Sequence, residues 1–381
     1  MRFKEIIGQE NAKQLLRGMA AGGRMPHALL LLCAPGSGGL SLALAFARLL
    51  NCEKPTDDPE TGEKEPCERC YACIKTGKWI HPDLHFSYPT VGAKEISTRF
   101  LKQWRAALAE NTYFSAQDWL DRLDAGNAQG NITRDECAEI VKKLSLKTFE
   151  AKKKILVMWL PEYLGKEGNR LLKIIEEPPD DTIFILVAEN PDLILNTILS
   201  RCQLVKVPPL QDDEIANSLI NKGLESDEAH AIARLADGSW HEAVRLSKET
   251  ANDNAKSFLY WMRKCFVGNG VELVRWTDNF SKLGREKQKL FLKYGLHFLR
   301  EVLILKMMDG LNPDLPPRLR PDELETAQKM KTVLDVNKIE QISRLFDDCI
   351  YYVERNANPK VLFLDASIRT HRILRAKVAN T

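Results

Sequence analysis

Long hydrophobic segments and a strong net charge are both missing from this sequence. Residues 1–7 contain no apolar core of the kind that a signal peptide needs, and the apolar run at 28–34 is far too short to cross a bilayer. A net charge of +3 on 381 residues excludes a simple polycation that coats nucleic acid. We therefore expect a cytoplasmic protein without a membrane partner.

Internal repeats and low-complexity tracts are absent too, which argues against a solenoid or an unfolded chain. With 44% hydrophobic and 28% charged residues, the composition is that of a globular protein. The length suffices for two or three domains. Nine cysteines in such a chain are more often thiols or metal ligands than disulfides.

The first part of the chain alternates between helical and strand patterns. Residues 9–21 fit an amphipathic helix, and 28–33 (ALLLLC) form a short apolar run typical of a parallel strand buried on both faces. A glycine-rich turn follows at once, and 41–51 are again helical. This order of strand, turn and helix is the setting of a phosphate-binding loop.

Further buried strands are expected at 155–160, 183–188 and 204–207, with a helix at 169–177 that ends at a double proline. The prolines at 208–209 follow the last strand and predict the first domain boundary.

Helical patterns dominate the rest of the chain. Residues 210–250 fit two or three short helices, and from 251 onward the pattern stays helical apart from a proline-rich loop at 311–321. Residues 99–135 form a helical insertion with a flexible tip at 125–131. Its expected aromatic anchors are Trp104, Tyr113, Phe114 and Trp119.

Residues 34–41 (APGSGGLS) have the frame of a phosphate-binding loop without its lysine. In a working loop, backbone N–H groups hold the phosphates, a lysine binds their oxygens and a hydroxyl holds Mg²⁺. Ala34 stands where the first glycine belongs, and Leu40 where the lysine belongs. Taken alone, the segment also fits an ordinary glycine-rich turn. The residues of this degenerate nucleotide site are Gly36, Gly38, Gly39, Leu40 and Ser41.

Four cysteines follow the helix after this loop with the spacing C-x14-C-x2-C-x2-C: Cys52, Cys67, Cys70 and Cys73. Four thiolates suit a structural Zn²⁺, whose closed coordination leaves no position for chemistry. Independent buried thiols and an iron–sulfur cluster are the alternatives. The other five cysteines are scattered and fit small buried hydrophobic residues.

These features, in their order, resemble the clamp-loader subunits of bacterial DNA polymerase III, and the delta prime subunits most closely. The resemblance is carried by IGQE at 7–10 and PHA at 26–28, the cysteine module, HPD at 81–83, NRLLKIIEEPP at 169–179, SRC at 200–202 and NANPKVLFLD at 356–365. The 99–135 insertion and the long segment between Cys52 and Cys67 depart from that pattern.

The resemblance implies an α/β AAA+ RecA-like P-loop domain over residues 1–208. A zinc module at 52–73 and the helical insertion at about 99–135 lie within it. A small three-helix lid would follow at 209–250, and an all-α collar that oligomerises at 251–381. Complexes of this family contain three ATP-hydrolysing motors, one delta subunit that opens the sliding clamp, and one delta prime.

Compared with the motors, the chain lacks most of the groups that bind and hydrolyse ATP. The lysine is Leu40, and the Asp-Glu pair expected after the 155–160 strand is replaced by MWLP with only Glu162 nearby. His241 stands where motors carry a lid arginine, and Asn190 is a weakly retained polar sensor. We expect no ATP in this site and no intrinsic ATPase activity.

Arg201 is retained in the SRC motif. In the resembling family this arginine reaches the nucleotide of the adjacent subunit and neutralises charge on its γ-phosphate, as an arginine finger acting in trans. An isolated arginine at a helix end is otherwise only solvated or capping.

The leading interpretation is a non-catalytic stator that completes a neighbour's ATP site, an accessory subunit of a DNA-directed DNA polymerase holoenzyme. Its partners would be the motor subunits and delta directly, and the sliding clamp and primer-template DNA through the complex. The alternatives are an ATP-hydrolysing gamma/tau-type motor subunit and a zinc-containing DNA-binding protein on the same fold.

Overall fold

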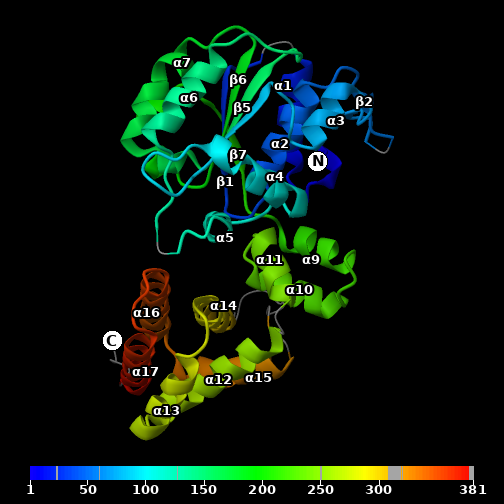
Figure 1. Cartoon of the computed structure of the whole chain (residues 1–381). Coiled ribbons are helices and arrows are strands. Elements are labelled where there is room, and N and C mark those ends of the chain that lie inside the picture. The colour runs from blue at the N-terminus through cyan, green and yellow to red at the C-terminus, as the bar shows by residue number, and fades with distance from the viewer. Residues whose placement is uncertain are drawn as a thin grey trace. The chain divides into compact units, whose positions relative to one another are not determined.

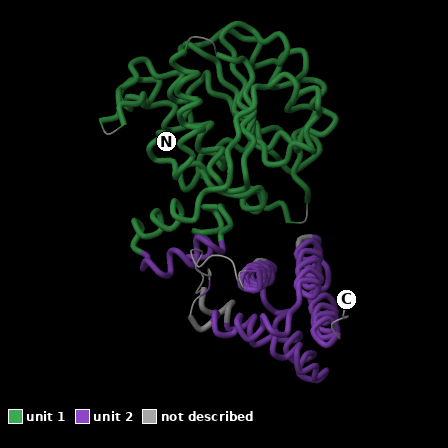
Figure 2. Tube along the Cα trace, turned by 180° about the vertical axis from the view of Figure 1, so that it is seen from behind, with its two compact units in different colours: residues 1–223, 236–244 green, residues 224–235, 245–381 purple. Residues whose placement is uncertain are grey.

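The computed structural model describes residues 1–22, 25–59, 61–126, 128–248, 251–307, 319 and 321–376. These residues divide into two compact units (Figure 2). Unit 1 consists of Met1–Gly223 with Ala236–Val244, and unit 2 of Leu224–Leu235 with Arg245–Thr381. The predicted boundaries at 208 and 250 stay predictions. No described helix is both long enough and apolar enough to span a membrane.

A five-stranded parallel sheet forms the centre of unit 1 (Figure 1). Its strand order is β4-β5-β6-β1-β7, so β1, which leads into the glycine-rich loop, lies between β6 and β7. Leu30 of β1 pairs with Leu186 on one side and Leu204 on the other. The strands are β1 (Ala28–Cys33), β4 (Leu84–Ser87), β5 (Lys154–Trp159), β6 (Thr182–Ala188) and β7 (Gln203–Val207).

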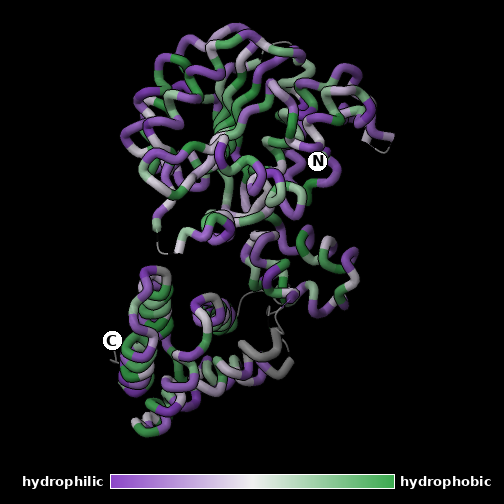
Figure 3. Tube along the Cα trace, in the orientation of Figure 1, coloured by the Kyte–Doolittle hydropathy of each residue, from purple (hydrophilic) through white to green (hydrophobic). Residues whose placement is uncertain are grey.

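The strands β1, β5 and β6 are continuous apolar runs (Figure 3), and burial on both faces of the sheet explains them. Alternate residues face opposite layers, so Leu29 and Leu31 belong to one hydrophobic core and Leu30 to another. The four predicted strands are confirmed within one residue at each end. β4 was not predicted, because its sequence LHFS is short and only half apolar.

Helices cover both faces of this sheet. On one side lie α1 (Glu10–Ala21), α2 (Gly39–Leu50), α4 (Leu101–Glu110) and α5 (Ala116–Arg122). On the other lie α6 (Arg134–Leu144), the 3-10 helix η3 (Pro161–Leu171), α7 (Leu172–Glu176) and α8 (Asn196–Leu199). The predicted helix at 169–177 is therefore partly correct, since its first three residues belong to η3.

The predicted insertion contains η2 (Ser97–Phe100), α4, α5 and the start of α6. Its four expected aromatic anchors are buried or half-buried, as predicted. Trp104 stacks on Tyr88 at 4.1 Å between ring centroids and lies edge-on to Trp119 at 5.0 Å. Aromatic contacts of this kind fix the insertion on the sheet.

Helices α9 (Asp212–Ile220), α10 (Ser226–Leu235) and α11 (Trp240–Lys248) occupy the predicted short-helix region. Unit 2 is helical, as predicted for the C-terminal region. Besides α10, it contains α12 (Ala251–Val267), α13 (Gly270–Phe280), α14 (Arg285–Met307), α15 (Pro321–Val333), α16 (Val336–Glu354) and α17 (Pro359–Arg375).

The core of unit 2 is rich in aromatic rings. Gly295 of α14 lies against Phe258 and Phe346, where an added Cβ would approach each ring to 2.6 Å, so only glycine fits without a shift. The predicted loop at 311–321 lies almost entirely outside the described residues.

Candidate functional site

The glycine-rich loop joins β1 to α2, in the setting that the sequence predicts. Gly36 and Gly38 both have positive φ, at 71° and 99°, and Gly38 precedes the first residue of α2. Gly39 has no space for a side chain beside Cys33. The turn between strand and helix therefore requires glycine at these three positions.

Leu40 does not leave an open position where the lysine would be. Its side chain is 5% exposed and belongs to the hydrophobic core beneath the loop. The hydroxyl of Ser41, at the position that holds Mg²⁺ in a working loop, lies 2.6 Å from the hydroxyl of Thr112. Both residues are buried.

The first turn of α11 covers the glycine loop from another side. The backbone N–H of Trp240 donates to the carbonyl of Gly36 at 3.0 Å, and Ser239 packs against that glycine. His241, at the position expected for the lid arginine, places its Nε2 3.4 Å from the Asp118 carboxylate of α5.

Two carboxylates meet at the carboxyl edge of β5 and β6. Glu162 follows β5 and accepts N–H groups from Glu189 and from Asn190, the latter at 2.7 Å. Burial raises the pKa of Glu162, and burial with the charge of Glu162 raises the pKa of Glu189 to about 7. Asn190 accepts the N–H of Asp192, so its side chain caps the next turn.

The sequence pattern did not identify Glu189 as a site residue. No adjacent acidic pair ends β5, as expected, but Glu162 gains an acidic neighbour from the next strand. The two residues are 27 positions apart, and only parallel pairing of β5 with β6 brings them together. A scan for carboxylates within three residues after each buried strand would have found both.

Arg201 follows α8 and is partly exposed, with 33% of its side chain accessible. Its guanidinium forms an ion pair with Glu176 at the end of α7 and donates to the Thr197 carbonyl at 2.7 Å. Glu176 belongs to the EEPP motif, so two sequence-predicted motifs are in contact. The arginine is therefore held within its own chain at the edge of unit 1.

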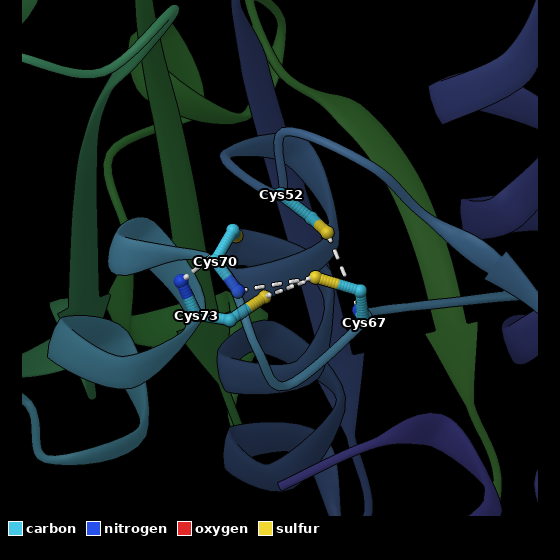
Figure 4. A group of neighbouring side chains, drawn as sticks. All are labelled: Cys52, Cys67, Cys70 and Cys73. Atoms are coloured by element: carbon cyan, nitrogen blue, oxygen red, sulfur yellow. Dashed lines mark hydrogen bonds between the residues drawn. The ribbon is translucent and has the colours of Figure 1, made fainter.

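The four cysteines of the predicted module lie together (Figure 4). Cys52 follows α2, Cys67 follows the antiparallel hairpin of β2 (Thr56–Asp57) and β3 (Lys64–Glu65), and Cys70 precedes α3 (Tyr71–Gly77), which contains Cys73.

All four sulfur atoms lie within 4.8 Å of one another. A tetrahedral zinc with bonds of about 2.3 Å places sulfur atoms about 3.8 Å apart, so the cluster needs little contraction to hold the ion. Backbone N–H groups also point at sulfur: Cys70 donates to Cys67 at 3.4 Å, and Cys67 to Cys52 at 3.3 Å. Such donors favour thiolates, and the residues therefore fit Zn²⁺.

The module is fastened to the beginning of the chain through a buried carboxylate. Glu65 of β3 accepts the backbone N–H groups of Phe3 and Lys4 at 3.1 and 3.2 Å, and it pairs with Arg17 of α1.

The aspartate of the HPD motif, like Glu65, joins two segments of the chain by accepting backbone N–H groups. Asp83 accepts three backbone N–H groups, from Phe149, Glu150 and Ala151, at 2.6–2.8 Å. Although burial opposes it, these donors lower the pKa of Asp83. The motif therefore positions the segment that leads into β5.

Residues 8–211 match the protein family described as DNA polymerase III, delta subunit. The match covers more than half of the chain. The chain belongs to this family. The predicted resemblance to clamp-loader subunits of DNA polymerase III is thereby confirmed.

Relatives of this delta-subunit family member are named as delta', tau and gamma subunits of DNA polymerase III. DNA polymerase III subunit delta' of Bacillus subtilis (strain 168) is 27% identical over 332 residues, which are 85% of this chain and 87% of the relative. Subunit tau of the same organism is 27% identical over 393 residues, or 97% of this chain and 61% of that protein. A DNA polymerase III gamma subunit-related protein from Thermotoga maritima superposes at a TM-score of 0.37 with 14% identity, covering 96% of this chain and 100% of the other.

Proposed function

We propose that this chain is the non-catalytic stator of a replicative sliding-clamp loader, supporting DNA replication as a delta prime-type accessory subunit. It would bind no ATP in its own site and would supply Arg201 to the ATP site of a neighbouring motor. The observation that carries this proposal is the contrast between a nucleotide site without its charged groups and an accessible arginine on the same unit.

The nucleotide site offers an incoming triphosphate little positive charge. The lysine position is a buried leucine, and the lid position is a histidine already beside Asp118. The nearby Glu162 and Glu189 could oppose phosphate whenever they ionise. Together these features disfavour ATP without requiring any change in the backbone of the loop.

The proposed architecture assigns residues 1–208 to a RecA-like domain, 209–250 to a three-helix lid and 251–381 to a collar that oligomerises. Zn²⁺ would be held by Cys52, Cys67, Cys70 and Cys73 as a structural ion. The proposed partners are motor subunits and a delta subunit, with the clamp and primer-template DNA contacted through the complex. A cytoplasmic location follows from that role.

Reconstitution of the loader tests this role. Replacing Arg201 by alanine should leave assembly intact and lower clamp-stimulated ATP turnover, because one motor site would lose a cation at its γ-phosphate. Arg170→Ala is the matched control, since Arg170 is another surface arginine in a local ion pair, with Glu167 at 2.6 Å. Equal turnover in the two variants would contradict the arginine-finger role.

The tau relative supports the motor alternative, because tau and delta' of Bacillus subtilis have the same sequence identity to this chain. It predicts that the purified chain binds a fluorescent ATP analogue in the presence of Mg²⁺. We expect no saturable binding up to millimolar nucleotide.

A further inference from the structure

The insertion at 99–135 reaches the glycine-rich loop through the short segment between α4 and α5. Thr112 and Tyr113 lie in that segment, and both are buried, with Tyr113 only 7% exposed. The insertion is thus a part of the nucleotide site as well as a layer on the sheet.

Tyr113 lies on the loop itself. A Cβ placed on Gly38 would be 2.9 Å from Cε1 of the Tyr113 ring, so the ring is in close contact with the loop backbone. At the same end of the ring, the phenol oxygen would lie 3.1 Å from that Cβ and accepts the N–H of Ile7 at 3.1 Å. The hydroxyl end of the ring is therefore held between the loop and the IGQE motif.

Thr112 contacts Ser41, the residue at the Mg²⁺-ligand position of a phosphate-binding loop. Its hydroxyl and that of Ser41 share a hydrogen bond of 2.6 Å, so the Ser41 oxygen is engaged within the protein. The two neighbouring residues thus contact both the glycine turn and the Mg²⁺-ligand position.

A cavity of about 1010 Å³ lies beside this segment, but it does not reach the loop. Thr112 and Tyr113 line it, together with Ile7 and Trp240, whereas none of residues 34–41 does. The two side chains therefore stand between the open space and the phosphate-binding frame.

We propose that Thr112 and Tyr113 form a built-in plug of the degenerate nucleotide site. This inference rests on the proposed function and extends it: the site is closed by the insertion in addition to lacking its lysine. A nucleotide can enter only in the fraction of molecules whose plug has left the loop, and its apparent affinity falls by that fraction. Restoring the lysine alone should then fail to restore binding.

The test uses the full chain and the fluorescent probe mant-ADP with Mg²⁺. Leu40→Lys should show no saturable binding up to the highest probe concentration. Leu40→Lys combined with Thr112→Ala and Tyr113→Ala should bind saturably, with a Kd about tenfold or more below that concentration. Leu40→Lys with Tyr113→Phe is the matched control, since it keeps the ring and should resemble Leu40→Lys.

A second measurement is independent of binding. In the Thr112→Ala/Tyr113→Ala chain with its natural Leu40, amide exchange should accelerate at residues 36–42, while α14 of unit 2 keeps its protection. If the triple variant fails to fold, Leu40→Lys/Tyr113→Ala replaces it in the titration.

The outcomes separate the plug from the stator role. Tight binding by Leu40→Lys alone, or no gain from removing Tyr113, would overturn the plug while the natural chain still binds no nucleotide. Saturable binding by the natural chain would instead overturn the proposed function itself.

Discussion

Replacing Glu189 by glutamine should stabilise the protein above neutral pH and have little effect at pH 5. Glu189 lies at the carboxyl end of β6, beside Glu162 and the buried thiol of Cys33. Burial and the charge of Glu162 raise its pKa to about 7, from an ordinary 4.5. Glutamine keeps the shape of the side chain and carries no charge.

The magnitude follows from the pKa difference. At about 1.4 kcal/mol per pH unit, the change from 4.5 to about 7 corresponds to about 3 kcal/mol. Between these values the folded chain holds a proton that the unfolded chain has lost, so its stability falls as the pH rises. Because Glu162 and Glu189 interact, part of this loss of stability on ionisation belongs to Glu162. We therefore expect Glu189→Gln to raise the free energy of unfolding by about 1–3 kcal/mol at pH 8.5.

Hydrogen exchange in a urea series provides the assay, because the amides of β1 and β6 report on unit 1 alone. The difference between Glu189→Gln and the natural chain is measured at pH 5 and pH 8.5. Glu177→Gln is the control, since Glu177 is exposed at a helix end. A gain of the same size at both pH values, or no gain at pH 8.5, would refute the reasoning.

Three further predictions concern the ion pair, the cysteines and the HPD motif. Glu176→Gln frees Arg201 from its ion pair; it should leave loader ATP turnover undiminished and change the unfolding free energy by less than about 1 kcal/mol, as denaturation will show. Cys70→Ser should lower zinc content, measured by elemental analysis, and the melting temperature by roughly 5 °C or more, whereas Cys202→Ser should retain the metal. Asp83→Asn should cost about 1–3 kcal/mol at pH 7. Because the pKa of Asp83 is lowered on folding, this difference should shrink below about pH 4, and denaturation at pH 7 and pH 3.5 would reveal a constant difference if the interpretation is wrong.

Local signals explain what the sequence predicted well. The runs at β1, β5 and β6 are long and apolar enough to identify buried parallel strands, and the glycines at 36–39 mark the turn between β1 and α2. The cysteine spacing was sufficient to predict one cluster, because three of its members lie within seven residues.

Contacts between distant segments could not be predicted in this way. Thr112 lies 71 positions from Ser41, and nothing in its neighbourhood distinguishes it from a loop threonine. Similarly, the pairing of Glu176 with Arg201 depends on how α7 and α8 pack below the sheet. Each of these relations is created by the tertiary fold, so periodicity and spacing carry no trace of it.

The carboxylate of Glu65 would make the first residues of the chain a reporter of the proposed zinc site. Since Phe3 and Lys4 donate their backbone N–H groups to a residue of the hairpin that precedes Cys67, loosening the hairpin should also release the N-terminus. A chelator would then expose these residues to proteases before the sheet itself unfolds. A probe attached at the N-terminus would therefore sense the cysteine cluster at residues 52–73.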